Sequence, residues 1–181
     1  DWVDDKTFIT KEELDNIAKS VKKLFCLVEY DRYHFDFPQQ VTNASIPEIK
    51  LTRTAVKRTF FSESVHGTAT VIKNDNKKLV ALTCAHVVDY PDTIFSYYIN
   101  ENNVETAILE SVSVKRKQRN FIRDLPDSGE LEIIMTDEDL DVAFLGNSFS
   151  DLNRFANPVF SYPVGNAKDL EWGSFVYILG Y

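Results

Sequence analysis

One histidine of this sequence stands where a proton-transferring residue would be useful. His86 follows Ala85 in the segment Leu82–Val88, and an apolar run that starts at Leu79 leads into it. A rigid strand would hold the backbone there while the side chain projects into a cleft. Imidazole side chains exchange protons near neutral pH, so such a histidine can take a proton from a hydroxyl and return it to a leaving group. The pattern predicts a general base at His86.

One aspartate is placed to support that base. Asp141 directly precedes the short apolar run Val142–Leu145. A carboxylate at the mouth of a strand can accept a hydrogen bond from Nδ1–H of a histidine, which fixes the tautomer and stabilises the imidazolium. The acidic residues at 137–139 are interpreted as solvated loop acids. We therefore predict that Asp141 lies beside His86.

A glycine upstream marks a close approach in the chain. Gly67 is followed by small and β-branched residues up to Ile72. A glycine in such a run is typical of a strand that bends sharply or approaches another backbone. His66, just before it, is expected to be a loop residue without a catalytic role.

The order of these segments resembles the trypsin-like serine proteases, and most of all their HtrA-like and other bacterial-type members. The resemblance lies in Gly67–Ile72, Leu82–Val88 and Asp141–Leu145, and in the tail Leu170–Tyr181, which is similar to a strand that opens the second barrel of that family. It implies an all-β chain: a chymotrypsin-like six-stranded β-barrel, the start of a second barrel and an N-terminal α-helix.

The same resemblance implies a function. His86 matches the family's general base and Asp141 its orienting carboxylate, in a serine endopeptidase that hydrolyses peptide bonds by acyl transfer. The nucleophilic serine would lie beyond the end of this chain, so the chain alone is predicted to be inactive. Its expected partners are a polypeptide substrate and a complementing C-terminal half of the protease domain. The usual location of members of this family, together with a first residue other than Met, favours a periplasmic or secreted location.

The sequence departs from the family pattern in several places. Ala69 stands where the family usually has a second glycine, and Cys84 where Asn or Ala is usual. Ser128, in an Asp-Ser-Gly turn, imitates part of a nucleophile motif but precedes Asp141, whereas the family order is His, Asp, Ser. We therefore do not assign Ser128 as the nucleophile.

Other functions remain open on the sequence alone. The chain could be a catalytically inactive trypsin-fold module that binds or regulates. It could belong to a protease with a cysteine nucleophile, although Cys26 and Cys84 do not fit that role in sequence order. It could also be an all-β binding domain in which His86 is a satisfied core histidine.

Composition excludes several classes of partner. The 181 residues carry a net charge of -8, which disfavours nucleic acid, and no stretch is apolar enough for a membrane span. Two cysteines make no disulfide framework, and no metal site or cofactor is expected. One basic cluster is interpreted as a solvated hairpin or loop; it consists of Lys115, Arg116, Lys117, Arg119 and Arg123.

Hydrophobic periodicity predicts one helix, at 10–25 with a capping box at Thr10 and Glu13, followed by short strands. A first strand is expected at 25–30 and an irregular loop at 31–47. Further strands are expected near 48–61, 67–73, 78–84, 93–99, 104–116, 130–136, 141–145 and 174–179. We divide the chain into an N-terminal part (1–47), the barrel (48–150), and a linker with the first strand of a second barrel (151–181).

Overall fold

The structure is a computed structural model that describes residues 9–75, 78–122, 130–148, 158–163, 165–172 and 176–181. Contacts divide the chain into two compact units. The first comprises Asp1–Phe25, His66–Val88 and Asn120–Tyr181, and the second comprises Cys26–Val65 and Asp89–Arg119. Each unit is described by itself below.

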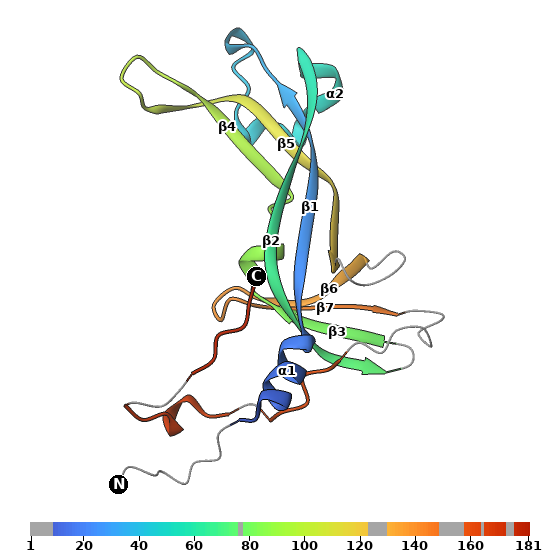
Figure 1. The fold of residues 1–181 in the computed structure, drawn as a ribbon. Coiled ribbons are helices and arrows are strands. Elements are labelled where there is room, and N and C mark those ends of the chain that lie inside the picture. The colour runs from blue at the N-terminus through green and yellow to red at the C-terminus, as the bar shows by residue number, and fades with distance from the viewer. Residues whose placement is uncertain (1–8, 76–77, 123–129, 149–157, 164, 173–175) are drawn as a thin grey trace. The chain divides into compact units, whose positions relative to one another are not determined.

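The described strands form one sheet. They are β1 (Val21–His34), β2 (Lys57–Asp75), β3 (Lys78–Thr83), β4 (Thr93–Ile99), β5 (Glu105–Ile122), β6 (Glu130–Asp137) and β7 (Val142–Ser148). Figure 1 labels these strands, and their order in the sheet is β1-β2-β3-β7-β6-β5-β4. A further pairing of β1 with β5 closes six antiparallel strands into a barrel, with β4 as an extra strand. Strand β7 lies beside β3 although three strands separate the two in the sequence. The predicted all-β barrel is confirmed.

The N-terminal helix forms as predicted but is shorter. Helix α1 runs from Lys11 to Ser20, and Thr10 and Glu13 make the reciprocal hydrogen bonds of a capping box. The expectation that the helix continues to residue 25 was wrong, because β1 starts at Val21. Along β1, Leu24 and Cys26 begin a two-residue alternation of fully buried side chains that continues through Val28 and Tyr30. That alternation fits a strand, and its burial outweighs the helical spacing of the same residues.

The boundaries of several other elements also differ from the prediction. Strand β1 continues to His34, so the expected loop starts later, and the barrel strands already begin within the segment 1–47. The two strands expected at 48–61 and 67–73 are one strand, β2, preceded by a helical turn, α2 (Leu51–Thr54). Short 3-10 turns occupy Phe37–Gln39, Asn43–Glu48 and Ala167–Asp169.

The expected last strand is not formed in its described part. Residues 176–179 lie outside any strand, and the side chain of Ile178 is 93% exposed. The chain there meets β2 through the Tyr181 N–H, which donates to Thr68 Oγ1 at 2.8 Å. A strand requires a ladder of backbone pairs, so the prediction of a strand opening a second barrel is wrong for these residues.

In the first unit, small and branched side chains fill the space between the strands that carry the site. Ala69 and Val71 on β2, Leu79 and Ala81 on β3, and Leu145 on β7 are fully buried. Strand β3 is antiparallel to both neighbours, with Thr70 opposite Leu82 on one side and Leu82 opposite Phe144 on the other. The C-terminal end of β3 is thereby fixed beside the start of β7.

In the second unit, two aromatic clusters supply the core. One is built around Tyr33 and Phe35, together with Leu109. The other contains Tyr30, whose ring stacks on Phe61 at 5.2 Å between ring centroids. Among the described residues of the whole chain, no helix combines the length and the apolar character that crossing a membrane requires.

Candidate active site

Strand register brings the two predicted site residues together. Thr83, the last residue of β3, lies opposite Ala143 on β7. The chain leaves β3 through Cys84 into the single turn of α3 (Ala85–Val88), which carries His86. On the other strand, Asp141 lies just ahead of β7. Both side chains therefore emerge at the same end of the β3–β7 pair.

The turn between β6 and β7 directs the aspartate toward the histidine. The Asp141 N–H donates to the Glu138 carbonyl at 3.2 Å, and the Leu140 N–H donates to Asp137 Oδ1 at 2.9 Å. Asp141 itself has φ 52°, in the left-handed region. Asp and Asn tolerate this region better than other residues with a Cβ. A left-handed residue at the end of a hairpin connection redirects its side chain out of the strand alternation.

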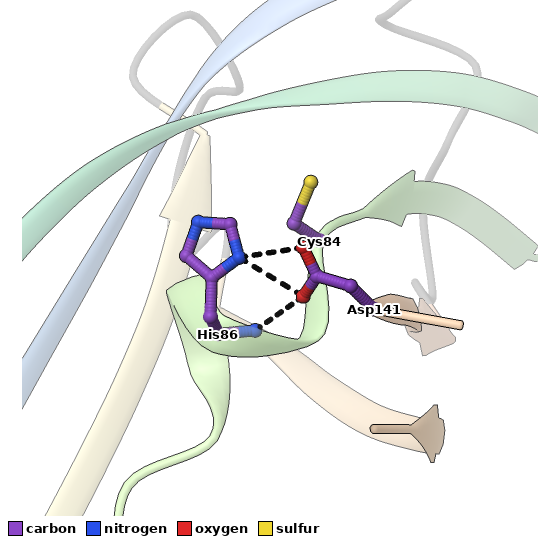
Figure 2. Close-up of side chains that lie close together, drawn as sticks. All are labelled: Cys84, His86 and Asp141. Carbon is purple, nitrogen blue, oxygen red and sulfur yellow. Dashed lines mark hydrogen bonds and ion pairs between the residues drawn. The ribbon is translucent and has the colours of Figure 1, made fainter. Parts of the chain in front are cut away.

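Both the imidazole ring and the backbone N–H of His86 form hydrogen bonds to the Asp141 carboxylate (Figure 2). His86 Nδ1 lies 2.7 Å from Asp141 Oδ2 and 2.9 Å from Oδ1. The backbone N–H of His86 also donates to Asp141 Oδ1, at 3.0 Å. The carboxylate thus holds both the ring and the backbone of the same residue. The predicted contact between His86 and Asp141 is present.

These hydrogen bonds determine how the pair is protonated. The backbone and ring hydrogen bonds from His86 hold the pKa of Asp141 below its usual value, so the carboxylate is ionised at neutral pH. An ionised carboxylate only accepts hydrogen bonds. Nδ1 must therefore carry a proton, and Nε2 of the neutral ring is left as an acceptor. Both side chains face solvent, with 69% of His86 and 47% of Asp141 exposed.

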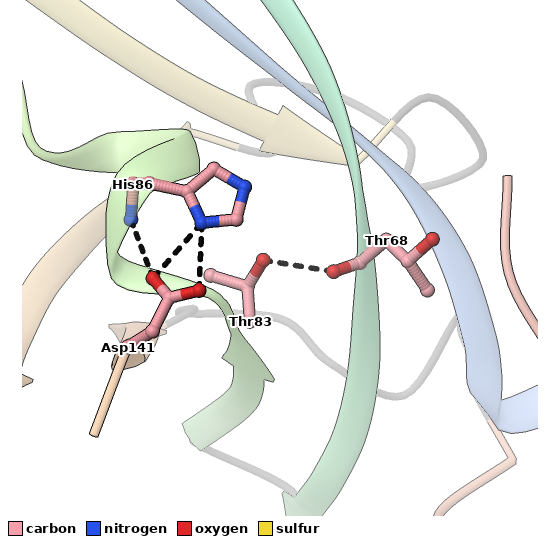
Figure 3. A network of polar contacts seen from close by, with 4 residues as sticks. All are labelled: Thr68, Thr83, His86 and Asp141. Carbon is pink, nitrogen blue, oxygen red and sulfur yellow. Dashed lines mark hydrogen bonds and ion pairs between the residues drawn. The ribbon is translucent and has the colours of Figure 1, made fainter.

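Two contacts fix the backbone that carries His86. The Thr83 hydroxyl donates to the carbonyl of Thr68 on β2 at 2.8 Å, at the point where β3 ends (Figure 3). Gly67 lies against the side chain of Val87 in α3, and the close approach expected at this glycine is made to that side chain. This role of Thr83 was not predicted, because a threonine inside a strand carries no local signal for a hydroxyl that donates to the neighbouring strand.

The two cysteines lie in different environments. Burial raises the pKa of the Cys26 thiol to about 11. Cys84 is exposed, and partial burial and the negative charge of Asp141 raise the pKa of its thiol. An activated nucleophilic cysteine has a lowered pKa. Neither thiol has the character of a nucleophile, which agrees with the exclusion made from sequence order.

The remaining sequence candidates lie outside this constellation. His66 packs edge-to-face on Phe25, with ring centroids 4.6 Å apart, which is a packing role. Within the basic cluster, Lys115 donates to the Tyr90 carbonyl and pairs with Asp92 at 2.8 Å. Ser128 and Arg123 lie outside the described residues.

Comparisons of the chain with protein-family models, with curated proteins and with solved structures found no match. The site is therefore interpreted from its own geometry.

Proposed function

We propose that this chain supplies the general base and its orienting carboxylate to a peptidase that works by acyl transfer. The observation that carries the proposal is the contact of His86 Nδ1 with Asp141 Oδ2 at 2.7 Å. In this arrangement Nε2 faces away from the carboxylate, free to accept the proton of a nucleophile (Figure 2). Among the described residues, no hydroxyl or thiol forms a hydrogen bond to Nε2.

The chemistry assigns a separate role to each residue. His86 Nε2 takes the proton of a serine hydroxyl as that oxygen attacks the peptide carbonyl, and later returns it to the leaving amine. Asp141 stabilises the imidazolium formed in between, because its negative charge lies against Nδ1–H. A retained His–Asp pair of this geometry supports a catalytic role over an inactive binding module, which has no need of both residues.

The solvent exposure of His86 and Asp141 is relevant to the partner that we expect to cover them. In a working triad the carboxylate is buried, whereas nearly half of the Asp141 side chain is exposed here. Water screens the attraction between an exposed carboxylate and an imidazolium, so the exposure weakens the stabilisation that Asp141 can provide. We propose that a second body of polypeptide, the complementing C-terminal half of a protease domain, covers the pair and brings the nucleophile to Nε2. The substrate would be a polypeptide.

A covalent probe tests the proposal. The natural protein that contains this chain is treated with a fluorophosphonate, which labels activated serines, alongside His86→Ala and a control, His34→Gln. His34 is a suitable control because its ring bonds to Thr59 Oγ1 at 2.9 Å, within the second unit. We expect labelling of the natural protein and the control, and little labelling of His86→Ala. Absence of labelling throughout contradicts the proposal and favours the inactive module. Equal labelling of all three also contradicts it, because the reactive serine would then not depend on His86.

A further inference from the structure

A third side chain with metal-binding chemistry lies at the His86–Asp141 pair. Cys84 Sγ, a ring nitrogen of His86 and a carboxylate oxygen of Asp141 all lie within 4.8 Å of one another (Figure 2). Thiolate, imidazole and carboxylate are the three ligand types that Zn²⁺ binds. Zinc sites that keep an open position use three protein ligands of these types. No zinc site was expected from the sequence, because the chain has only three histidines and no close pairing of His with Cys was recognised. Asp141, the third group, is 55 residues away from His86 in the sequence.

The backbone holds the three ligands on a rigid frame. Cys84 directly follows β3, His86 is in the turn of α3, and Asp141 directly precedes β7, which pairs with β3. Sites built on paired strands are more precise than sites on free loops. Both Cys84 and His86 are exposed, so an ion from solvent can reach them.

The spacing of His86 and Asp141 needs only a small adjustment to admit the ion. Tetrahedral zinc with Zn–N, Zn–O and Zn–S distances of about 2.0–2.3 Å places ligand atoms roughly 3.3–3.6 Å apart. His86 Nδ1 and Asp141 Oδ2 lie 2.7 Å apart, so they must separate by roughly 0.6 Å to reach that spacing. Asp141 Oδ1 can meanwhile keep the hydrogen bond from the His86 backbone N–H, at 3.0 Å. That bond would orient the ligating carboxylate, as outer hydrogen bonds do in metal sites.

We propose that Cys84, His86 and Asp141 form a binding site for a zinc-type divalent ion, and that a bound ion and the proton-accepting state of His86 exclude each other. The ion would occupy the place of the proton that Nδ1 now donates to Asp141. The proton of the neutral ring would move to Nε2, and the Cys84 thiol would release its proton to solvent. A protonated Nε2 cannot take a proton from a nucleophile. The binding claim stands by itself, whereas its inhibitory consequence rests on the proposed function.

Binding is tested without any assay of activity. The full chain, freed of metal, is titrated with Co²⁺ alone, and the absorption from thiolate-to-cobalt charge transfer is recorded before Zn²⁺ is added in competition. We expect one ion per chain and loss of the absorption when Zn²⁺ displaces Co²⁺. Cys84→Ser and Asp141→Asn should each weaken Zn²⁺ binding by about 100-fold or more, since loss of even an outer partner costs 10–100-fold. Cys26→Ala is the control, because Cys26 is fully buried within the second unit.

For Cys84 and for Asp141, a specific result would rule the residue out as a ligand. A thiolate–cobalt band that persists in Cys84→Ser, or disappears in Cys26→Ala, overturns the proposed ligand set. Equal Zn²⁺ affinity of the unaltered chain and Asp141→Asn does the same for the carboxylate. Circular dichroism of each variant shows whether the barrel is folded, and Cys84→Ala serves as a second test if Cys84→Ser is not. Failure of peptidase activity has no bearing on any of these results.

The imidazole ring of His86 provides the test of whether a bound ion excludes its proton-accepting state. Nitrogen-15 NMR of the His86 imidazole reports which nitrogen carries the proton. We expect Nδ1–H in the metal-free chain and Nε2–H after one equivalent of Zn²⁺. Zinc on Nε2, or a tautomer that does not change on zinc binding, contradicts the proposed mode of binding. In the natural protein, fluorophosphonate labelling should fall as the site fills and recover on chelation, and Cys84→Ser should require about 100-fold more Zn²⁺ for the same loss.

Discussion

Gly67 on β2 lies directly against Val87 in the turn that carries His86. A Cβ added at Gly67 would lie 2.7 Å from Val87 Cγ1 and 2.9 Å from Cγ2. Val87 is almost fully buried, with 5% of its surface exposed, and its short branched side chain has little room to turn away. The glycine therefore makes space for the turn that carries His86.

The substitution Gly67→Ala is expected to displace that turn. Overpacking of this kind costs about 1–3 kcal/mol of unfolding free energy. Urea denaturation measures the stability, and the His86 ring signals report the displacement. Gly165→Ala is the matched control, because a Cβ there meets no atom within 4 Å; its stability should stay within about 0.5 kcal/mol of the unaltered chain. Equal stability of the two variants would show that α3 is not packed against Gly67 as described.

The hydroxyl of Thr83 is expected to fix the exit from β3. Thr83→Val keeps the shape but removes the donor to the partly buried Thr68 carbonyl, at a cost of about 0.5–1.5 kcal/mol, the usual contribution of one hydrogen bond. Thr83→Ser retains the hydroxyl and is the control for the loss of a methyl group. Denaturant titrations compare the three proteins. A valine variant as stable as the serine variant would rule out a contribution from this hydrogen bond.

Substitution of the carboxylate tests its orienting role. Asp141→Asn keeps a side chain that tolerates the left-handed backbone and can still accept the His86 backbone N–H, but it removes the charge. Under the proposed function, turnover by the natural protein should fall on the order of 10⁴-fold, as for the corresponding substitution in a triad. Peptide hydrolysis is the assay, and nitrogen-15 NMR should show loss of the single Nδ1–H tautomer. Full activity together with an altered tautomer would remove Asp141 from the mechanism.

Local sequence signals predicted the contact between His86 and Asp141, because the barrel fixes the ends of the strands that carry them. Apolar runs before His86 and after Asp141 predicted two strands, and the pairing of Thr83 with Ala143 places their ends side by side. The capping box at Thr10 was readable for the same reason, because it depends on residues three apart. Neither strand register nor the left-handed backbone of Asp141 can be read from local pattern.

The errors arise where tertiary pairing overrides local pattern. Leu24 fits the helical spacing and also begins the strand alternation of buried side chains in β1, and its place in the buried face of β1 determines the strand. Gly67 was expected near the start of a strand at 67–73, yet β2 runs through it from Lys57 to Asp75, and the glycine packs closely against Val87. Cys84 lies in an apolar run of the sequence, but the chain leaves β3 at that residue, and its side chain is exposed near Asp141.

The two thiols are expected to react very differently. Cys26 is fully buried with a pKa of about 11, so almost none of it is thiolate at pH 8. Cys84 is exposed and should be alkylated by iodoacetamide in the folded chain. Mass spectrometry of digests should locate a single label at Cys84 under native conditions and two labels in urea. Labelling of Cys26 at a rate comparable with Cys84 would show that the core of the second unit opens readily.

The N-terminal helix should respond to acid through Glu13. Hydrogen bonds from the backbone and side chain of Thr10 lower the pKa of this carboxyl group. A lowered pKa in the folded state means that its contribution is fully present above the unfolded value of about 4.3 and is lost as the pH falls through the folded value. The ¹³Cα shifts of Lys11–Ser20 should therefore lose helical character below about pH 4. Glu13→Gln can still accept the capping hydrogen bond but carries no charge, so its helix shifts should change little over the same range. Parallel pH profiles in the two proteins would mean that the cap does not depend on the ionised form of Glu13.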